Sequence, residues 1–163
     1  MLFSAAAAQA QAGADGGPIF GRPRDPEPKS VQEMLFKMQI DKAKKDYDEM
    51  LERGEQALNI SMEIEKSYEK TGTLTQDDRE KLDDVEKLVK KIRGELGGGD
   101  DEKSESDADG PKDVVSGVKY LAKSTADLVD ELKKTTRFSI SAAAIQSSNT
   151  VLGALRFLRL KDR

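Results

Sequence analysis

The chain has 163 residues, with 36% apolar and 36% charged side chains and a net charge of −4. It contains no Cys and no His, which excludes thiol chemistry, disulfides, a Ser–His–Asp hydrolase and the usual zinc ligands. Charges of both signs are interleaved, so the basic field typical of nucleic-acid-binding proteins is missing. This composition favours extended helical structure over a deep globular core, and the expected fold class is all-α.

The first 29 residues are predicted to lack regular structure. Residues 1–12 resemble the remnant of a secretory signal peptide, because Leu2 and Phe3 lead into alanines at small-x-small spacing. Residues 13–29 hold all but one of the prolines and are predicted to be a disordered Pro- and Gly-rich segment. The signal-like pattern predicts an exported or periplasmic protein. The alternative is a cytoplasmic protein with an Ala-rich leader.

Residues 30–72 predict one long amphipathic helix. Its inward positions alternate in steps of four and three, the repeat of a helix that packs against another helix. They are Phe36, Ile40, Ala43, Tyr47, Met50, Gly54, Ala57, Ser61, Ile64 and Tyr68. Ser30 with Glu33 is the pattern of a capping box at the start, and Gly72 suits the end. At about 1.5 Å per residue the helix would extend about 60 Å, so it needs partners along its length.

A second helix is predicted after a short turn. Thr75 is expected to cap it, with Asp77 and Asp78 in the first turn. Its apolar seam consists of Leu82, Val85, Leu88, Val89, Ile92 and Leu96. Acid–base pairs four residues apart are expected on its surface, namely Asp77 with Lys81, Asp83 with Lys87 and Glu86 with Lys90. The short turn predicts an antiparallel, coiled-coil-like hairpin over residues 30–96.

This second helix is long enough to cover only the latter half of the first. The part of the first seam that is left without a partner consists of Phe36, Ile40, Ala43 and Tyr47. Either the C-terminal region folds back onto this part, or another copy of the chain packs there.

Residues 97–112 are predicted to be a disordered acidic linker. Glu105, Asp107 and Asp109 imitate the first half of a calcium-binding EF-hand loop. The position that should supply the closing bidentate Glu is occupied by Ser116. A calcium site is therefore not expected.

Residues 113–163 are predicted to form one or two further helices. The first begins near Asp113, and its seam is Val114, Val118, Leu121, Thr125, Leu128 and Leu132, widened by Val115, Ala122 and Val129. A long uncharged run between Arg137 and Arg156 raises the question of a membrane span. Its Ser, Gln, Asn and Thr side chains are too costly in lipid, so the run predicts a closely packed helix instead.

The tail that follows Leu155 combines large apolar side chains with cations. On a helical wheel Phe157 and Leu160 point away from the side of Leu155 and Leu158, so no single face buries them all. Three interpretations are open: a docking peptide for a protein, an anchor on anionic lipid, or a helix end buried in a bundle.

No catalytic, cofactor-binding or metal-binding motif is found. Paired acids such as Glu63 and Glu65 lie on faces that are expected to be solvated, where no pocket activates them. The sequence therefore predicts a protein that is not an enzyme and that binds no cofactor, nucleic acid or small-molecule substrate.

The predicted function is that of a non-catalytic helical scaffold or protein–protein interaction protein, exported, that binds a partner or a second copy through its helix seams. The residues expected to interact are Phe36, Ile40, Tyr47, Arg156, Phe157, Arg159 and Leu160. The alternative is a peripheral membrane-surface module, which would anchor to anionic lipid through its basic C-terminal tail.

Overall fold

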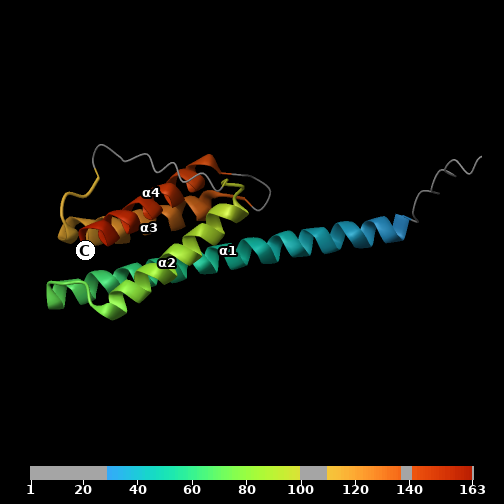
Figure 1. Ribbon diagram of the computed structural model, residues 1–163. Coiled ribbons are helices and arrows are strands. Elements are labelled where there is room, and N and C mark those ends of the chain that lie inside the picture. The colour runs from blue at the N-terminus through green and yellow to red at the C-terminus, as the bar shows by residue number, and fades with distance from the viewer. Residues whose placement is uncertain (1–28, 100–109, 137–140, 163) are drawn as a thin grey trace, which may run out of the picture. The chain divides into compact units, whose positions relative to one another are not determined.

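A computed structural model describes residues 29–99, 110–136 and 141–162, and within these ranges the chain is entirely helical (Figure 1). The helices are α1 (Lys29–Thr71), α2 (Gln76–Glu95), α3 (Val114–Lys134) and α4 (Ala142–Lys161). The prediction of an all-α fold that begins with a long helical hairpin is confirmed. The predictions for the signal-like leader, for the Pro-rich segment and for most of the acidic linker concern residues outside these ranges.

The chain divides into two compact units, residues 1–36 and residues 37–163. Helix α1 begins in the first unit and continues into the second, and its first eight residues are the described part of the first unit. The helix bundle belongs entirely to the second unit.

The start of α1 differs from the prediction. The helix already includes Lys29, and no hydrogen bond joins Ser30 to Glu33 in the described part of the chain. Ser30 cannot act as an N-cap because the residue before it is itself helical. The end of α1 is as predicted: Gly72 has a left-handed φ of 70°, and its N–H donates to the Tyr68 carbonyl at 2.8 Å.

Helix α2 ends in a Schellman turn built on glycines. The N–H of Gly98 donates to the carbonyl of Arg93 at 2.9 Å. The N–H of Gly97 donates to the carbonyl of Gly94 at 3.1 Å, and Gly97 has a φ of 82°. A Cβ atom on Gly98 would lie 2.6 Å from Cγ of Arg93. The glycine run therefore terminates the helix by backbone geometry.

Helix α1 has two neighbours in the bundle. Helix α2 returns along it after the turn, and α3 packs on another side. The hydroxyl of Tyr47 donates to the carbonyl of Leu132 at 3.2 Å. Further along α1, the hydroxyl of Ser61 lies 3.3 Å from that of Thr125, and both residues are fully buried. Because the later α1 residue meets the earlier α3 residue, the two helices are antiparallel.

Helix α4 packs along both α2 and α3. Asp162, just after the end of α4, pairs with Arg79 near the start of α2 at 2.6 Å. Gly117, near the start of α3, lies against Leu158 near the end of α4, where an added Cβ would come within 2.8 Å of a Leu158 methyl. Helix α4 is therefore antiparallel to both neighbours.

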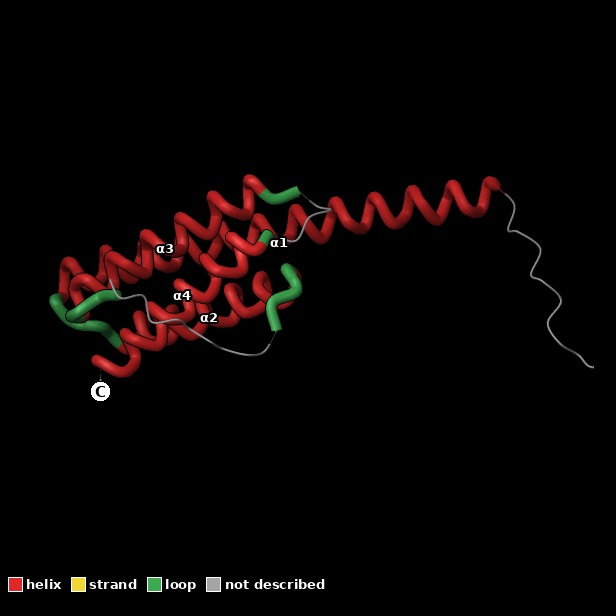
Figure 2. The backbone as a smooth tube through the Cα atoms, turned by 90° about the horizontal axis from the view of Figure 1, so that it is seen from above, coloured by secondary structure: helices red, strands yellow, loops and turns green. Residues whose placement is uncertain are grey.

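The four helices form a bundle in the cyclic order α1, α2, α4, α3, with antiparallel neighbours throughout (Figure 2). Helices α2 and α3 are diagonal and parallel. The connection from Leu96 to Asp113 therefore joins opposite ends of the bundle, a distance of about 30 Å for helices of this length.

The predicted seams form the core, except for Phe36, Ile40 and Ala43 of the α1 seam. The fully buried large side chains of the core are Ile64, Leu82, Val85, Val89, Ile92, Val118, Leu121, Leu128, Leu132, Val151, Leu155 and Leu158. Among the residues expected to widen the third seam, Ala122 and Val129 are buried but Val115 is exposed. Val115 lies about 100° around the helix from the centre of that seam, which places it outside the interface.

Two of the three predicted surface ion pairs on α2 are present. Asp77 pairs with Lys81 at 2.8 Å, and Glu86 pairs with Lys90 at 2.7 Å. Asp83 instead pairs with Arg159 of α4, and Lys87 pairs with Asp84 at 2.9 Å. The prediction for Asp83 is wrong because the packing of α4 brings a guanidinium to it, which sequence spacing within one helix does not reveal.

Replacing Gly97 with Ala is expected to lower the free energy of unfolding by about 1–2 kcal/mol, because alanine must then adopt the left-handed conformation. Gly98→Ala is also expected to destabilise, because its Cβ would collide with the Arg93 side chain. Gly99→Ala is the matched control, since nothing lies within 4 Å of a Cβ at that position. Urea unfolding followed by circular dichroism measures all three variants. Equal stabilities of the three would contradict the role given to the Schellman turn.

Candidate functional site

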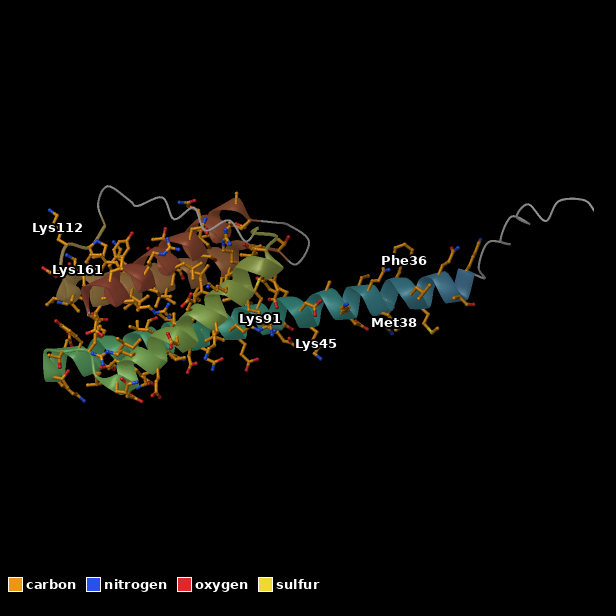
Figure 3. All side chains as sticks on the ribbon, viewed as in Figure 1. Phe36, Met38, Lys45, Lys91, Lys112 and Lys161 are labelled. Atoms are coloured by element: carbon orange, nitrogen blue, oxygen red, sulfur yellow. The ribbon has the colours of Figure 1, made fainter. Side chains whose placement is uncertain are left out.

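The N-terminal part of α1 presents large apolar side chains to solvent. The exposed residues there are Met34, Leu35, Phe36, Met38 and Ile40. Figure 3 labels Phe36 and Met38, whose side chains stand out from the ribbon of α1. Single exposed apolar residues are common on protein surfaces, but a run of them on one helix is typical of an interaction surface.

The heptad register of α1 explains which side chains remain exposed. We call Ile40 and Ala43, both in the second unit, the exposed seam; Ile40 is exposed and Ala43 is half-buried. They continue the stripe that faces α3 in the bundle, where Tyr47 is half-buried and bonded to Leu132. Phe36 remains 67% exposed and Ile40 45% exposed.

The reason for this exposure is a difference in helix length. Helix α1 has 43 residues, whereas α2, α3 and α4 have 20, 21 and 20. Near the end of α3, Leu132 meets α1 at Tyr47, and the last residue of α2 pairs with Arg53. The C-terminal region does fold back onto part of this seam, because α3 covers Tyr47, whereas Ile40 stays exposed. The expectation that a second copy packs there stays a prediction.

The three residues predicted to interact on the α1 seam differ in their exposure. Phe36 and Ile40 are accessible, but Tyr47 contributes to the α1–α3 interface of the bundle itself. A substitution of Tyr47 would therefore disturb folding as well as binding.

The C-terminal tail forms part of the bundle. Phe157 packs on α3, where a Cβ on Gly117 would lie 3.0 Å from its ring, and the ammonium of Lys161 lies 5.8 Å from the ring centroid. Leu160 is 64% exposed. The tail residues are thus brought to the end of the bundle at the α1–α2 turn, whereas Ile40 lies beyond the other end.

A groove of about 300 Å³ lies between α2 and α4 beside this tail. It is lined by Glu86, Lys90, Leu152, Leu155, Arg156, Arg159 and Leu160. Burial alone would raise the pKa of Glu86, but hydrogen bonds from Lys90 and Arg159 hold it below its ordinary value. Arg159 also pairs with Asp83, so its charge is used in fastening α4 to α2.

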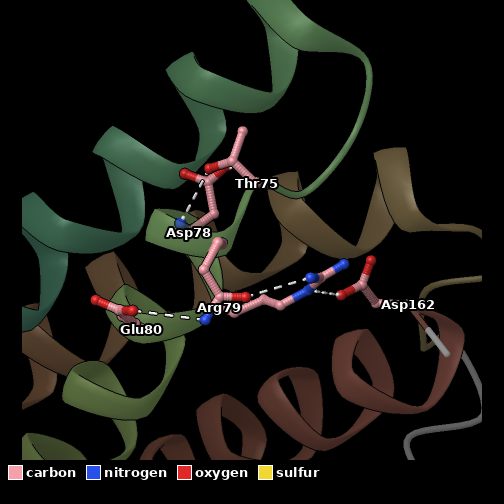
Figure 4. Close-up of polar contacts among 6 residues, drawn as sticks. Thr75, Asp78, Arg79, Glu80 and Asp162 are labelled. Atoms are coloured by element: carbon pink, nitrogen blue, oxygen red, sulfur yellow. Dashed lines mark hydrogen bonds and ion pairs between the residues drawn. The ribbon is translucent and has the colours of Figure 1, made fainter.

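The sequence analysis placed Asp78 in the first turn of α2 but did not predict its burial or its role in the cap; it lies fully buried at the start of the helix (Figure 4). Its carboxylate accepts from the N–H of Thr75 at 2.9 Å, from the Thr75 hydroxyl at 2.7 Å and from the Ser67 hydroxyl at 2.9 Å. Burial alone would raise the pKa of Asp78, but these hydrogen bonds outweigh it and hold the pKa below its ordinary value of 3.8. Asp78 is a capping residue, and the spacing Thr75-x-x-Asp78 was the signal for it.

Comparison with protein-family models, with curated proteins and with solved structures gave no match. None of the described helices combines the length and the apolar character that crossing a membrane requires. Function is therefore inferred from the geometry of this chain alone.

Asp78→Asn is expected to lower stability at pH 7 by about 0.5–2 kcal/mol, because the reciprocal cap loses its charged acceptor. Since the pKa of Asp78 is lower in the folded protein than in the unfolded chain, its contribution is complete above pH 3.8 and is lost as the pH falls below that value. The stability difference between wild type and variant should therefore shrink on acidification. Urea unfolding at a series of pH values measures it, and a difference that is constant down to the lowest pH would contradict this role.

Phe157→Ala is expected to destabilise the bundle by about 1–3 kcal/mol, because a partly buried ring is removed from the α3–α4 contact. Leu160→Ala, its matched control in the same tail, should change stability by less than about 0.5 kcal/mol. Thermal and urea unfolding measure both. Unchanged stability in the Phe157 variant would show that the ring does not serve the bundle and would favour a docking role for the tail.

Proposed function

We propose that the protein is a non-catalytic helical interaction module that binds another protein through the exposed seam of α1. The observation that carries this proposal is the continuity of the heptad stripe. The stripe that packs against α3 within the bundle extends past Tyr47 to Ala43 and Ile40, and none of the described helices buries Ile40.

Binding at this seam has a clear energetic source. Full burial of a Phe or Ile side chain stabilises by about 1.5–3 kcal/mol relative to exposure. Part of that gain is offset by the lost freedom of the two partners, so Ile40 needs surrounding contacts to reach stable binding. The bundle supports such binding because it holds one end of α1 in a packed core.

The alternative, a lipid anchor in the α4 tail, has less support. Arg159 is ion-paired with Asp83 and Glu86, and Phe157 packs on α3. Both groups would have to leave the bundle before they could enter a membrane surface.

The proposal includes an exported location, as the signal-like pattern of residues 1–12 predicts. Mass spectrometry of the mature N-terminus after fractionation of the source cells tests this part. A chain that starts near Gln11 or Gly13 and lies outside the cytoplasm is the expected result, and an intact leader in the cytoplasmic fraction would contradict it.

A photo-crosslinking amino acid at Ile40 is expected to give a covalent adduct with a partner in the source cells. The matched control is Met62, a large apolar residue on the same helix that is 42% exposed, against 45% for Ile40. Adducts at Ile40 and none at Met62 are the expected outcome. Equal yields at the two positions, or no adduct at either, would contradict a partner on the exposed seam.

Ile40→Glu should also shift the native-gel mobility of the protein from a larger complex to the free chain, while Met62→Glu should not. Circular dichroism is the control for folding, because both side chains point to solvent and their replacement should leave the bundle intact.

A further inference from the structure

Two lysines, Lys37 and Lys44, lie beside the exposed seam, and neither has a carboxylate partner among the described residues. Among the interactions of the described residues, none pairs an acid with Lys37, Lys42 or Lys44. Lys45 forms an ion pair with Glu49, with 3.7 Å between Nζ and Oε1. Residues 37–46 contain four lysines and two aspartates, so this stretch is positive although the whole chain is acidic.

Most cations at the helix contacts of the bundle do have a carboxylate partner. Those with a carboxylate partner on another element are Arg53, Arg79, Lys81, Lys133 and Arg159. Several of these pairs join two helices, as Arg53 with Glu95 does. The bundle therefore matches cations with acids where its helices meet.

Lys37 and Lys44 occupy equivalent places beside the exposed seam. They are seven residues apart, so they lie within about 20° of each other around the helix axis. Both are within about 60° of Ile40, on the side where a partner helix packed on the seam would place its own flanking residues. In helix pairs, charged residues at these positions decide which partner is accepted.

We propose that the exposed seam binds an acidic helical surface of a partner protein, one whose apolar strip is bordered by Glu or Asp. This inference rests on the proposed function and adds the chemistry of the partner. Ile40 and Ala43 would meet the apolar strip, and Lys37 and Lys44 would meet the carboxylates.

A membrane surface fits this part of α1 less well. Met38 and Ile40 are both exposed, and they lie about 160° apart around the helix, so one flat lipid surface cannot bury both. A protein groove can enclose two sides of a helix.

A second copy of the same segment also fits less well. Two copies would bring together two stretches that each carry four lysines and two aspartates, so like charges would oppose one another.

The test uses the full chain and two synthetic heptad-repeat peptides as probes, with identical apolar positions. One peptide has Glu and the other has Lys at the positions that flank the apolar strip. Fluorescence anisotropy should show that the full chain binds the acidic peptide at least about tenfold more tightly than the basic one, with affinity falling as salt rises. The double variant Lys37→Glu/Lys44→Glu should reverse this preference.

The matched control is Lys91→Glu/Lys123→Glu, which makes the same change of charge at exposed lysines on α2 and α3. Its preference should equal that of the wild type. Equal binding of the two peptides, binding of neither, or an equal effect of the control variant would overturn the inference.

Two further outcomes would also overturn it: salt-dependent binding to anionic lipid vesicles that is lost in the Lys37→Glu/Lys44→Glu variant, or identification of a second copy of this chain as the adduct at Ile40. A failed peptide experiment with specific crosslinks at Ile40 would leave the proposed function standing. Absence of those crosslinks would remove the proposed function itself.

Discussion

The length of α1 is the constraint on which the rest of the structure depends. A helix of 43 residues has been combined with three helices of about half that length. Apolar surface of α1 is buried only where another helix lies beside it, so the bundle encloses the stretch from Tyr47 onward. Before Tyr47 in the chain the same heptad repeat continues, and its apolar side chains are exposed to water. A partner that buried them would remove the free-energy cost of that exposure.

The order of the helices explains why one of the two predicted interaction regions, the tail, is part of the bundle, whereas the other stays exposed. Helix α4 fills the place between α2 and α3, and its C-terminal residues meet the start of α2 through Arg79 with Asp162 and Arg159 with Asp83. Such partly exposed ion pairs contribute little stability each, but they define the position of α4. The tail is therefore used in closing the bundle, whereas no described part of the chain closes over Ile40.

Much of this fold could be predicted from periodicity and end signals. The seams of α2 and α3, the Gly72 end and the Thr75 cap all follow from local rules, because each depends on residues within one helix or one turn. Contacts between helices could not be predicted in the same way. The partner of Asp83, the exposure of Val115 and the role of Tyr47 depend on which helix lies beside which, and periodicity identifies a face without identifying its neighbour.

The same distinction applies to the lysines beside the exposed seam. In the sequence, Lys37 and Lys44 are two of many charges on an ordinary helix surface. The structure distinguishes them because α2 and α3 end before this part of α1. The apolar strip and the two lysines beside it are therefore exposed on the same helix surface. An apolar strip alone would accept many helices, but unmatched charges at its border penalise partners of the wrong sign. Specificity at this surface is therefore a consequence of where the bundle ends.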